Sequence, residues 1–285
     1  MKKKEEIIVY QNPDPLLVSK QGIFPGVSLL PNNEILIIFS IGQAFDSSDQ
    51  RPFVTKSKDN GRTWSTPKQL HNHIYGDHEE TDTLKPLLLQ NGNLIATGYA
   101  FVRPDPLTPI VDPISFEVLP LKNKISFSND DGESWTKPNS FSVLNKPLEL
   151  SGPCIQLSSG RILGACPPFH LGENDHSGWI IYSDDNGKTW GKLSEFFNTP
   201  KGEIAAWECR LCATDNNSVA VIFWTYDNVK KINLNNHIVY SHDGGENFES
   251  AIDTGIKAQA SNLIWYEKNI ILTIHSHRES PTGLI

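Results

Sequence analysis

The stretch Ser183-Asp-Asp-Asn-Gly-Lys-Thr-Trp190 decides the fold, because the same phrase returns at three other places in the chain. The other copies are Ser57-Lys-Asp-Asn-Gly-Arg-Thr-Trp64, Ser128-Asn-Asp-Asp-Gly-Glu-Ser-Trp135 and Ser241-His-Asp-Gly-Gly-Glu-Asn-Phe248. An alternating apolar stretch precedes each copy, which is typical of a β-strand. We therefore predict a β-hairpin turn at each copy. Its glycine supplies a positive φ, its aspartate accepts hydrogen bonds from the turn, and its aromatic side chain folds back on the hairpin.

A second hairpin pattern lies upstream of every copy, with turns near Asn33, Gly92, Gly160 and Asn217, and a fifth turn lies near Lys268. Each repeat thus holds four strands and spans roughly 50 to 70 residues, which matches a β-propeller blade. We predict an all-β fold with blades at residues 22–70, 80–145, 149–198 and 205–253 and a partial blade at 257–285. All of them are assigned to one domain, residues 1–285. Residues 6–10 are a candidate strand for closing the ring, and a closed smaller ring is the alternative.

The bulk properties of the chain exclude several partners. A formal net charge of -8 at pH 7 and a pI near 5.6 argue against nucleic acid and anionic membranes. The apolar run at residues 7–9 is too short for a signal peptide or a membrane span, so we expect a cytoplasmic protein. The four cysteines give no disulfide framework, and we expect no metal and no other cofactor. Cys209 and Cys212 form a Cys-x-x-Cys pair, but a strand would point them to opposite faces.

Loops rich in charged and polar residues are expected at one end of the blades. Successive loops of a four-stranded meander alternate between its two ends, so the connections between second and third strands lie opposite the repeat turns. These connections and the neighbouring strand starts carry carboxylates, imidazoles and arginines, which predicts the functional end. The candidate residues there are Gln43, Asp46, Asp49, Arg51, Arg103, Glu208, Arg210, Asp227, His275, His277 and Arg278.

Two carboxyl groups at this end fit glycoside hydrolysis, which commonly needs an acid and a second group that attacks or activates an attacker. Asp49 is the first candidate for the acid and Asp46 the second; the alternative for both is a solvated loop carboxylate. Glu208 is the candidate for the second role. Its charge stands in an apolar strand, where burying a charge without a function or a partner would cost stability. The alternative for Glu208 is a structural ion pair with Arg210. For His275 and His277, solvent-facing hydrogen bonds are favoured over a metal site.

The repeated phrase resembles the Asp-box, the BNR repeat of the sialidase (neuraminidase) superfamily, whose propellers have six blades. The resemblance implies a six-bladed propeller of four-stranded antiparallel blades, here truncated within blade five. It also implies that the Asp-boxes lie on the face away from the catalytic centre. Asp59, Asp130, Asp185 and Asp243 are therefore expected to be structural.

The residues that match the family's catalytic motifs are incomplete. Glu208, in Trp207-Glu-Cys-Arg210, resembles the glutamate that assists the family's tyrosine nucleophile, and Gln259-Ala-Ser261 resembles the opening of its fifth blade. The Arg-Ile-Pro motif that supplies the first arginine is replaced by Ile23-Phe-Pro25, and the second arginine is missing from Phe223-Trp-Thr-Tyr226. The third arginine and the tyrosine would fall after residue 285.

The resemblance therefore implies a sialidase-like glycoside hydrolase or a related carbohydrate-active enzyme, rather than a true sialidase. Its partner would be a carbohydrate or glycoconjugate, and the oligomeric state is left open. The alternatives are a non-catalytic propeller that binds a carbohydrate or a protein, and a degenerate repeat scaffold. The residues expected to bind substrate are Gln43, Arg51, Arg103, Arg210, Asp227, His275, His277 and Arg278.

Overall fold

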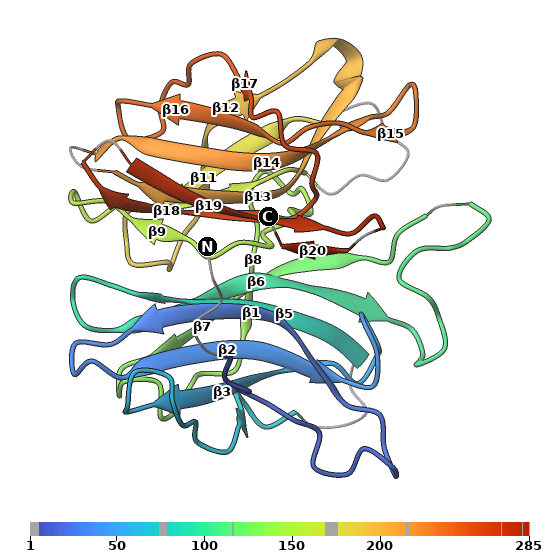
Figure 1. Cartoon of the computed structure of the whole chain (residues 1–285), viewed down its shortest axis with the longest axis vertical. Coiled ribbons are helices and arrows are strands. Elements are labelled where there is room, and N and C mark those ends of the chain that lie inside the picture. The colour runs from blue at the N-terminus through green and yellow to red at the C-terminus, as the bar shows by residue number, and fades with distance from the viewer. Residues whose placement is uncertain are drawn as a thin grey trace. The chain divides into compact units, whose positions relative to one another are not determined.

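The computed structural model describes residues 6–73, 79–115, 117–168, 176–214, 217–268, 270–280 and 282–284. Over these residues the chain forms twenty β-strands and one short 3-10 helix, η1 (Pro200–Gly202). In the same residues there is no helix with the length and apolar character needed to cross a bilayer. The strands divide into five antiparallel sheets, which are the blades of a β-propeller (Figure 1). The predicted all-β fold is therefore confirmed.

The chain divides into two compact units, and the first comprises residues 1–110 and 119–139. Its first sheet has the order β1-β2-β3-β4, formed by Gln21–Leu29, Ile35–Gly42, Arg51–Ser57 and Lys68–Gln69. Its second sheet has the order β5-β6-β7-β8, formed by Glu79–Leu88, Leu94–Arg103, Leu121–Ser128 and Asn139–Phe141. In Figure 1, β1, β2 and β3 follow one another in blue as a simple meander.

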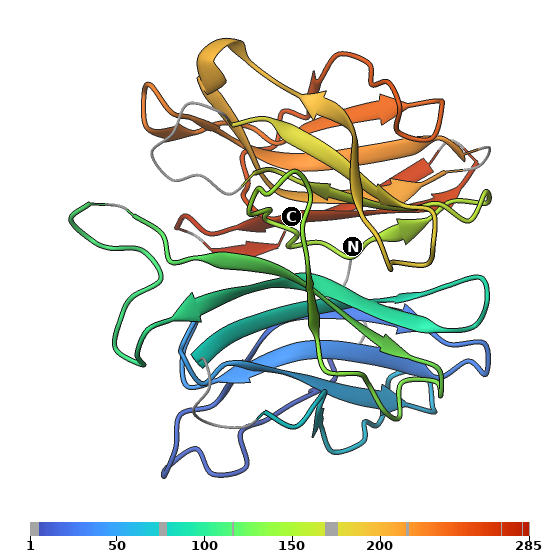
Figure 2. The same ribbon diagram turned by 180° about the vertical axis from the view of Figure 1, so that it is seen from behind.

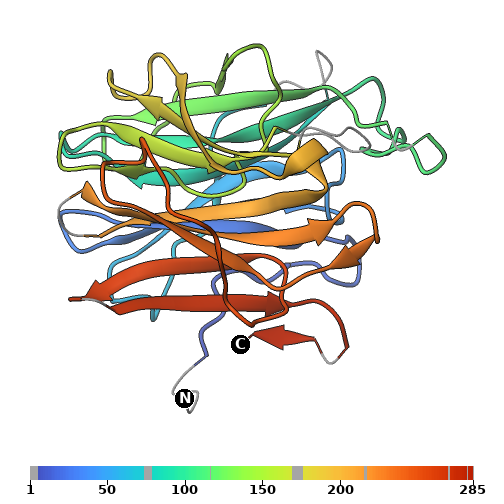
Figure 3. The ribbon, with the colours of Figure 1, turned by 90° about the horizontal axis from the view of Figure 1, so that it is seen from above.

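The second unit comprises residues 111–118 and 140–285 and contains three sheets. The third sheet, seen in green to yellow in Figure 2, consists of β9 to β12 at Ile155–Gln156, Ile162–Cys166, Gly178–Ser183 and Gly191–Phe197. The fourth consists of β13 to β17 at Ile204–Ala213, Val219–Asp227, Ile232–Asn233, His237–Ser241 and Ile252–Asp253. The fifth, drawn in red in Figure 3, consists of β18 to β20 at Ser261–Glu267, Ile270–His277 and Gly283–Leu284.

The sheets lie close to the predicted blades, with three differences. The fourth sheet has a fifth strand, β15, which pairs with β14 outside the predicted four. Residues 6–10, the candidate strand for closing the ring, form no strand, and the first strand begins at Gln21. The fifth sheet has three strands rather than the predicted two, because β20 pairs with the end of β19. The long connection after β6 also holds an isolated bridge between Val111 and Val118.

Apolar residues pack between neighbouring sheets of each unit because side chains alternate across a strand. In the first unit, β2, β3, β5 and β6 contribute to one core cluster that includes Leu36, Ile38 and Leu84. In the second unit, Cys209 lies in the cluster shared by the third and fourth sheets. Cys212 lies in the cluster shared by the fourth and fifth sheets. The prediction that these two thiols face opposite sides is therefore confirmed.

The four repeat turns have the predicted construction. In the third blade, Asp185 Oδ1 accepts the Ser183 hydroxyl at 2.8 Å and the Thr189 N–H at 2.9 Å. Gly187 has a φ of 88° and its carbonyl accepts the Trp190 indole N–H at 3.0 Å. Since the aspartate carboxylate accepts the hydroxyl and backbone N–H bonds, its charged form is favoured, and the pKa values of Asp59, Asp130, Asp185 and Asp243 are lowered.

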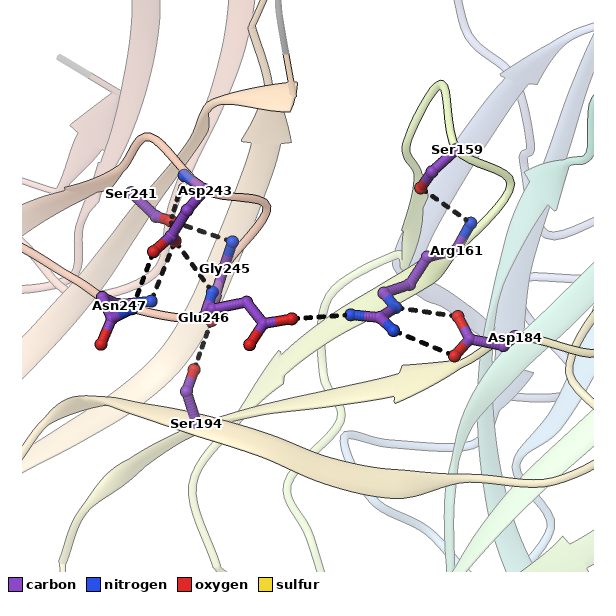
Figure 4. A network of polar contacts seen from close by, with 9 residues as sticks. All are labelled: Ser159, Arg161, Asp184, Ser194, Ser241, Asp243, Gly245, Glu246 and Asn247. Atoms are coloured by element: carbon purple, nitrogen blue, oxygen red, sulfur yellow. Dashed lines mark hydrogen bonds and ion pairs between the residues drawn. The ribbon is translucent and has the colours of Figure 1, made fainter.

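An arginine connects two of these turns (Figure 4). The Arg161 guanidinium binds both oxygens of Asp184, at 2.8 and 3.0 Å, and Glu246 Oε1 at 3.1 Å. Asp184 belongs to the third repeat turn and Glu246 to the fourth. Ser194 also donates to the carbonyl of Gly245. The repeat turns therefore join neighbouring blades as well as closing their own hairpins.

Candidate functional site

Glu208 lies at a β-bulge, where the backbone of β13 departs from regular strand geometry. The register of β13 and β14 shifts between Trp207 and Arg210, and Glu208 has a φ of 46°. A side chain at positive φ is unfavourable by roughly 1–2 kcal/mol, and such residues cluster at functional sites. Within the first unit, β1 shows the same feature, with a register shift between Ile23 and Gly26 and a φ of 54° at Phe24. Both inner strands therefore bulge at the motif positions that the sequence singled out.

The Glu208 carboxylate is held on one oxygen and open on the other. Its Oε1 accepts a hydrogen bond from Arg278 Nη2 at 2.9 Å, and the Arg278 backbone N–H is fixed by Gln259 Oε1 at 2.9 Å. Its Oε2 is buried and has no hydrogen-bond partner among the residues that the structure describes. A buried carboxylate oxygen without a hydrogen bond lowers the stability of the folded protein. The same oxygen can accept a hydrogen bond from a hydroxyl group of a ligand.

A second carboxyl group, Glu149, lies beneath the bulge. It is 9% exposed and accepts the backbone N–H of Glu208. Burial and then the negative charge of Glu208 raise the pKa of Glu149 to about 8, although Arg210 and Arg278 act in the opposite direction. Near neutral pH the pair is therefore unequal: Glu149 holds a proton, and Glu208 is the ion-pair partner of an arginine.

Arg210 and Gly152 complete the support of the bulge. Arg210 Nη1 donates to the Ser151 hydroxyl at 2.8 Å and to the Cys209 carbonyl at 2.9 Å. A Cβ on Gly152 would lie 2.8 Å from both Arg210 Cδ and the Cys209 carbonyl oxygen, so this close approach requires glycine. The predicted ion pair between Glu208 and Arg210 is not the contact observed, since Glu208 pairs with Arg278.

Aromatic side chains form a wall beside Glu208. Trp207 stacks on Tyr226 with ring centroids 4.8 Å apart and meets Trp224 edge-on at 4.9 Å. The Arg278 guanidinium lies over the Trp224 ring at 5.9 Å. The three rings are half-buried, so part of each ring reaches solvent. An arrangement of aromatic surface with few fixed polar groups is typical of small-molecule sites.

The first unit holds the two aspartates predicted as candidate acids, in different environments. Asp49 Oδ1 accepts the Ser47 hydroxyl at 2.7 Å and the Gln43 N–H at 3.0 Å, so it closes its own loop. Asp46 has a φ of 51° and is half-buried, and its carbonyl accepts Arg103 Nη2. Burial raises the pKa of Asp46 to about 6, although the charge of Arg103 acts in the opposite direction.

Phe24 stands where the sialidase resemblance expects an arginine. Its ring meets Phe45 edge-on at 5.2 Å, and Lys85 Nζ lies 5.6 Å from its centroid. Phe45 is 65% exposed, whereas Lys85 is buried. The first unit therefore presents an aromatic surface at this position, with one cation behind it.

Arg51 and Arg103, predicted to bind substrate, are both buried in the first unit. Arg51 donates to the carbonyls of Ser48 and Gln50 at 2.9 and 2.6 Å, and its Nη2 lies 2.8 Å from His73 Nε2. Arg103 donates to the Thr81 hydroxyl and to the carbonyls of Thr108 and Asp46. Both arginines thus fix loop backbone.

The remaining predicted residues divide between structure and surface. Asp227 Oδ1 accepts the N–H groups of Val229 and Lys230, as a turn residue does. The expectation that His275 faces solvent is wrong: it is 2% exposed and bonded to Ser261 at 2.9 Å, and burial lowers its pKa. His277 is half-buried, and the side chain of Gln43 is exposed.

Glu149 is not among the candidate site residues chosen from the sequence, although the strand starts at the functional end include it. A signal for it exists, because Glu149 stands between Leu148 and Leu150, which are fully buried. Burying a single charge among apolar residues is costly unless a partner compensates it.

Comparisons with known proteins agree with the repeat and the fold. The family model described as BNR/Asp-box repeat matches residues 181–191. A crystal structure of a protein of unknown function from Dyadobacter fermentans has a TM-score of 0.79 at 22% identity, covering 99% of this chain and 81% of that one. A variant of NanB sialidase from Streptococcus pneumoniae has a TM-score of 0.68 at 15% identity and 95% coverage, and this chain spans 58% of its length. No curated protein matches the chain.

A further similar structure is the α-L-arabinanase of Penicillium chrysogenum complexed with arabinobiose. It has a TM-score of 0.61 at 15% identity, covering 91% of this chain and 76% of the arabinanase. All of these identities are low, so the likeness concerns the fold. The chain resembles the sialidase superfamily in its Asp-box repeats and in its propeller blades, of which the described residues form five.

Proposed function

We propose that the protein is a sialidase-like glycoside hydrolase, or a related carbohydrate-active enzyme, that acts in the cytoplasm on a carbohydrate or glycoconjugate. One observation carries the proposal: Glu208 Oε2 is a buried carboxylate oxygen without a partner, held at a strained bulge beside an arginine and an aromatic wall. Such an oxygen is suited to accept the hydroxyl hydrogen of a sugar or of an attacking group.

Asp46 is proposed as the acid in preference to Asp49. A general acid must hold its proton near the working pH, and the pKa of Asp46 is raised by burial to about 6. Asp49 instead accepts two hydrogen bonds from its own loop, which favours a structural role. Phe24 at the expected arginine position favours a sugar that does not need the carboxylate clamp of sialic acid recognition.

The test is turnover of a panel of glycosides by the wild type and by Glu208→Gln, Asp46→Asn and Asp49→Asn variants. Glu208→Gln and Asp46→Asn should each lose at least roughly a hundredfold in kcat/KM, and Asp49→Asn much less. Glu267→Gln, at an exposed position of the second unit, is the matched control. The enzyme proposal fails if both carboxylate variants keep full activity.

A non-catalytic carbohydrate-binding propeller is the second candidate, and the aromatic wall of Trp207, Trp224 and Tyr226 favours it. Aromatic surface is used for sugar binding whether or not the sugar is cleaved. Saturable binding of a glycan without turnover, unchanged in both amide variants, would support this candidate over the enzyme.

A further inference from the structure

A pocket of about 470 Å³ lies at the repeat turns of the first unit, at the opposite end of β3 from the loop that carries Asp46 and Asp49. It is lined by parts of β3 and β4, by the first repeat turn and by the second repeat turn. We call it the Trp64–Trp135 pocket after the aromatic side chains of the two turns. Its volume is within the range of pockets that hold small ligands.

The two tryptophans of this pocket are fixed in orientation and keep part of their surface open. The Trp64 indole N–H donates to the Gly61 carbonyl at 2.9 Å, and that of Trp135 to the Gly132 carbonyl at 3.2 Å. Both side chains are half-buried. Both residues line the pocket, and because their indole N–H groups are already used, they contribute apolar ring surface to it.

Trp190 and Phe248, the matching aromatic residues of the second unit, are also half-buried, and each packs against another ring. Trp190 of the third repeat turn stacks on Phe141 with centroids 5.0 Å apart and an interplanar angle of 24°. Phe248 of the fourth repeat turn lies against Phe196 at 6.0 Å. The aromatic residues of the repeat turns therefore differ in their neighbours. Trp64 and Trp135 line one pocket together, whereas Trp190 and Phe248 pack on Phe141 and Phe196.

Lysines dominate the charge of the pocket. Its lining includes Lys56, Lys58 and Lys68 and one carboxylate, Glu133. Lys56 Nζ lies 2.5 Å from Glu133 Oε1, and Lys68 adds to the positive field that lowers the pKa of Glu133. Lys58 is 81% exposed and lies 3.4 Å from Glu34. Three ammonium groups against the carboxylates of Glu133 and Glu34 leave a local positive charge, which attracts anions although the net charge of the chain is -8.

From these features we propose that the Trp64–Trp135 pocket binds an anionic saccharide, a sugar carrying carboxylate or sulfate groups. The apolar face of a pyranose ring packs on the open indole surface, and its anionic groups pair with Lys58 and Lys68. A neutral sugar would make no use of the positive charge of Lys58 and Lys68, and a free inorganic anion would not use the tryptophans. The site is separate from Glu208, and it requires neither Glu208 nor Asp46.

Isothermal titration of the full chain tests this proposal with three probes: a heparin tetrasaccharide, chitotetraose as a neutral tetrasaccharide, and inorganic sulfate. We expect saturable binding of the heparin tetrasaccharide that weakens as salt is raised, and binding at least about tenfold weaker for the other two probes. A Lys58→Ala and Lys68→Ala double variant should bind the heparin tetrasaccharide about tenfold more weakly. Glu208→Gln should bind it unchanged.

Lys188→Ala is the matched control, because Lys188 is an exposed lysine of the third repeat turn and is not part of the pocket. Trp64→Leu removes one ring, and its melting temperature shows whether the turn survives the change. The double lysine variant keeps Ser57, Asp59, Thr63 and Trp64, whose hydrogen bonds build the turn, so it tests the proposal even if Trp64→Leu unfolds. Equal binding by the double variant, equal binding of inorganic sulfate, or no binding of the heparin tetrasaccharide would each overturn the proposal.

Discussion

Arg278 Nη2 lies 2.9 Å from Oε1 of Glu208, so an arginine that follows β19 neutralises a carboxylate on the bulge of β13. The contact uses one carboxylate oxygen and leaves the other, Oε2, buried without a partner. A structural ion pair would be more stable with both oxygens satisfied. The one-sided pairing is therefore an arrangement that keeps an acceptor available, and the predictions below examine what maintains it.

Replacing Glu149 with Gln should remove a pH dependence of stability. Below the ordinary glutamate pKa of 4.5 the group is protonated in both folded and unfolded chains, but between 4.5 and about 8 only the folded chain keeps the proton. The wild type thus loses free energy of unfolding as pH rises through this window. We expect Glu149→Gln to gain stability relative to the wild type by roughly 1 to 3 kcal/mol between pH 5 and pH 8.

Thermal and urea unfolding at the two pH values measure this difference. Glu267→Gln is the control, since Glu267 is exposed in the same unit and should follow the wild type at both pH values. Parallel stability curves for the wild type and Glu149→Gln would show that Glu149 does not hold a proton near neutral pH.

Glycine and alanine at position 208 should differ in stability. Both remove the carboxylate, but alanine keeps a Cβ at a φ of 46°, which glycine tolerates without strain. We expect Glu208→Gly to be more stable than Glu208→Ala by about 1 kcal/mol, and both variants to lose the activity assigned to Glu208. Urea unfolding of the two variants measures the difference. If alanine were the more stable, the bulge would not be strained.

Much of the fold could be predicted from the sequence, because its signals are local. Each repeat turn is determined within eight residues, as in Ser183 to Trp190, and strand alternation is visible without knowing the neighbours. The site depends on contacts between distant segments. The bulge at Glu208 requires Glu149 and the missing side chain of Gly152, about 60 residues away along the chain, and no local pattern encodes that meeting.

The preference between Asp46 and Asp49 shows the same limit. Both belong to one polar loop, and the sequence favoured Asp49 as the acid. In the structure Ser47 and the Gln43 backbone engage Asp49, whereas burial raises the pKa of Asp46. The conformation of the closed loop determines which of the two carboxylates accepts hydrogen bonds from the loop. That closure includes Arg103, which lies on another strand.

In the second repeat turn, Asp130→Asn should weaken the protein mainly above pH 4. The hydrogen bonds of Ser128 and Ser134 lower the pKa of Asp130 from 3.8 to about 2, so its stabilising contribution is present above 3.8 and is lost as pH falls through about 2. The melting temperature of the variant should therefore lie below that of the wild type at pH 5 and approach it at pH 2. Asp131→Asn, at the exposed neighbouring position with a φ of 56°, should melt like the wild type at both pH values.

Truncating two adjacent residues of β18 should cost different amounts of stability, because the two side chains lie on opposite faces of the fifth sheet. Leu263 is 3% exposed and packs in the cluster shared with the fourth sheet, whereas Ile264, opposite Leu272, is 56% exposed. Leu263→Ala leaves a cavity and should cost roughly 2 to 4 kcal/mol, while Ile264→Ala should cost less than about 1 kcal/mol. Urea unfolding measures the loss in free energy of unfolding for both variants. The two losses are comparable because each variant replaces an aliphatic side chain of the same size with alanine. A large loss for Ile264→Ala would mean that the apparently open face of this sheet is covered in solution, and equal small losses would mean that the fifth sheet does not pack on the fourth.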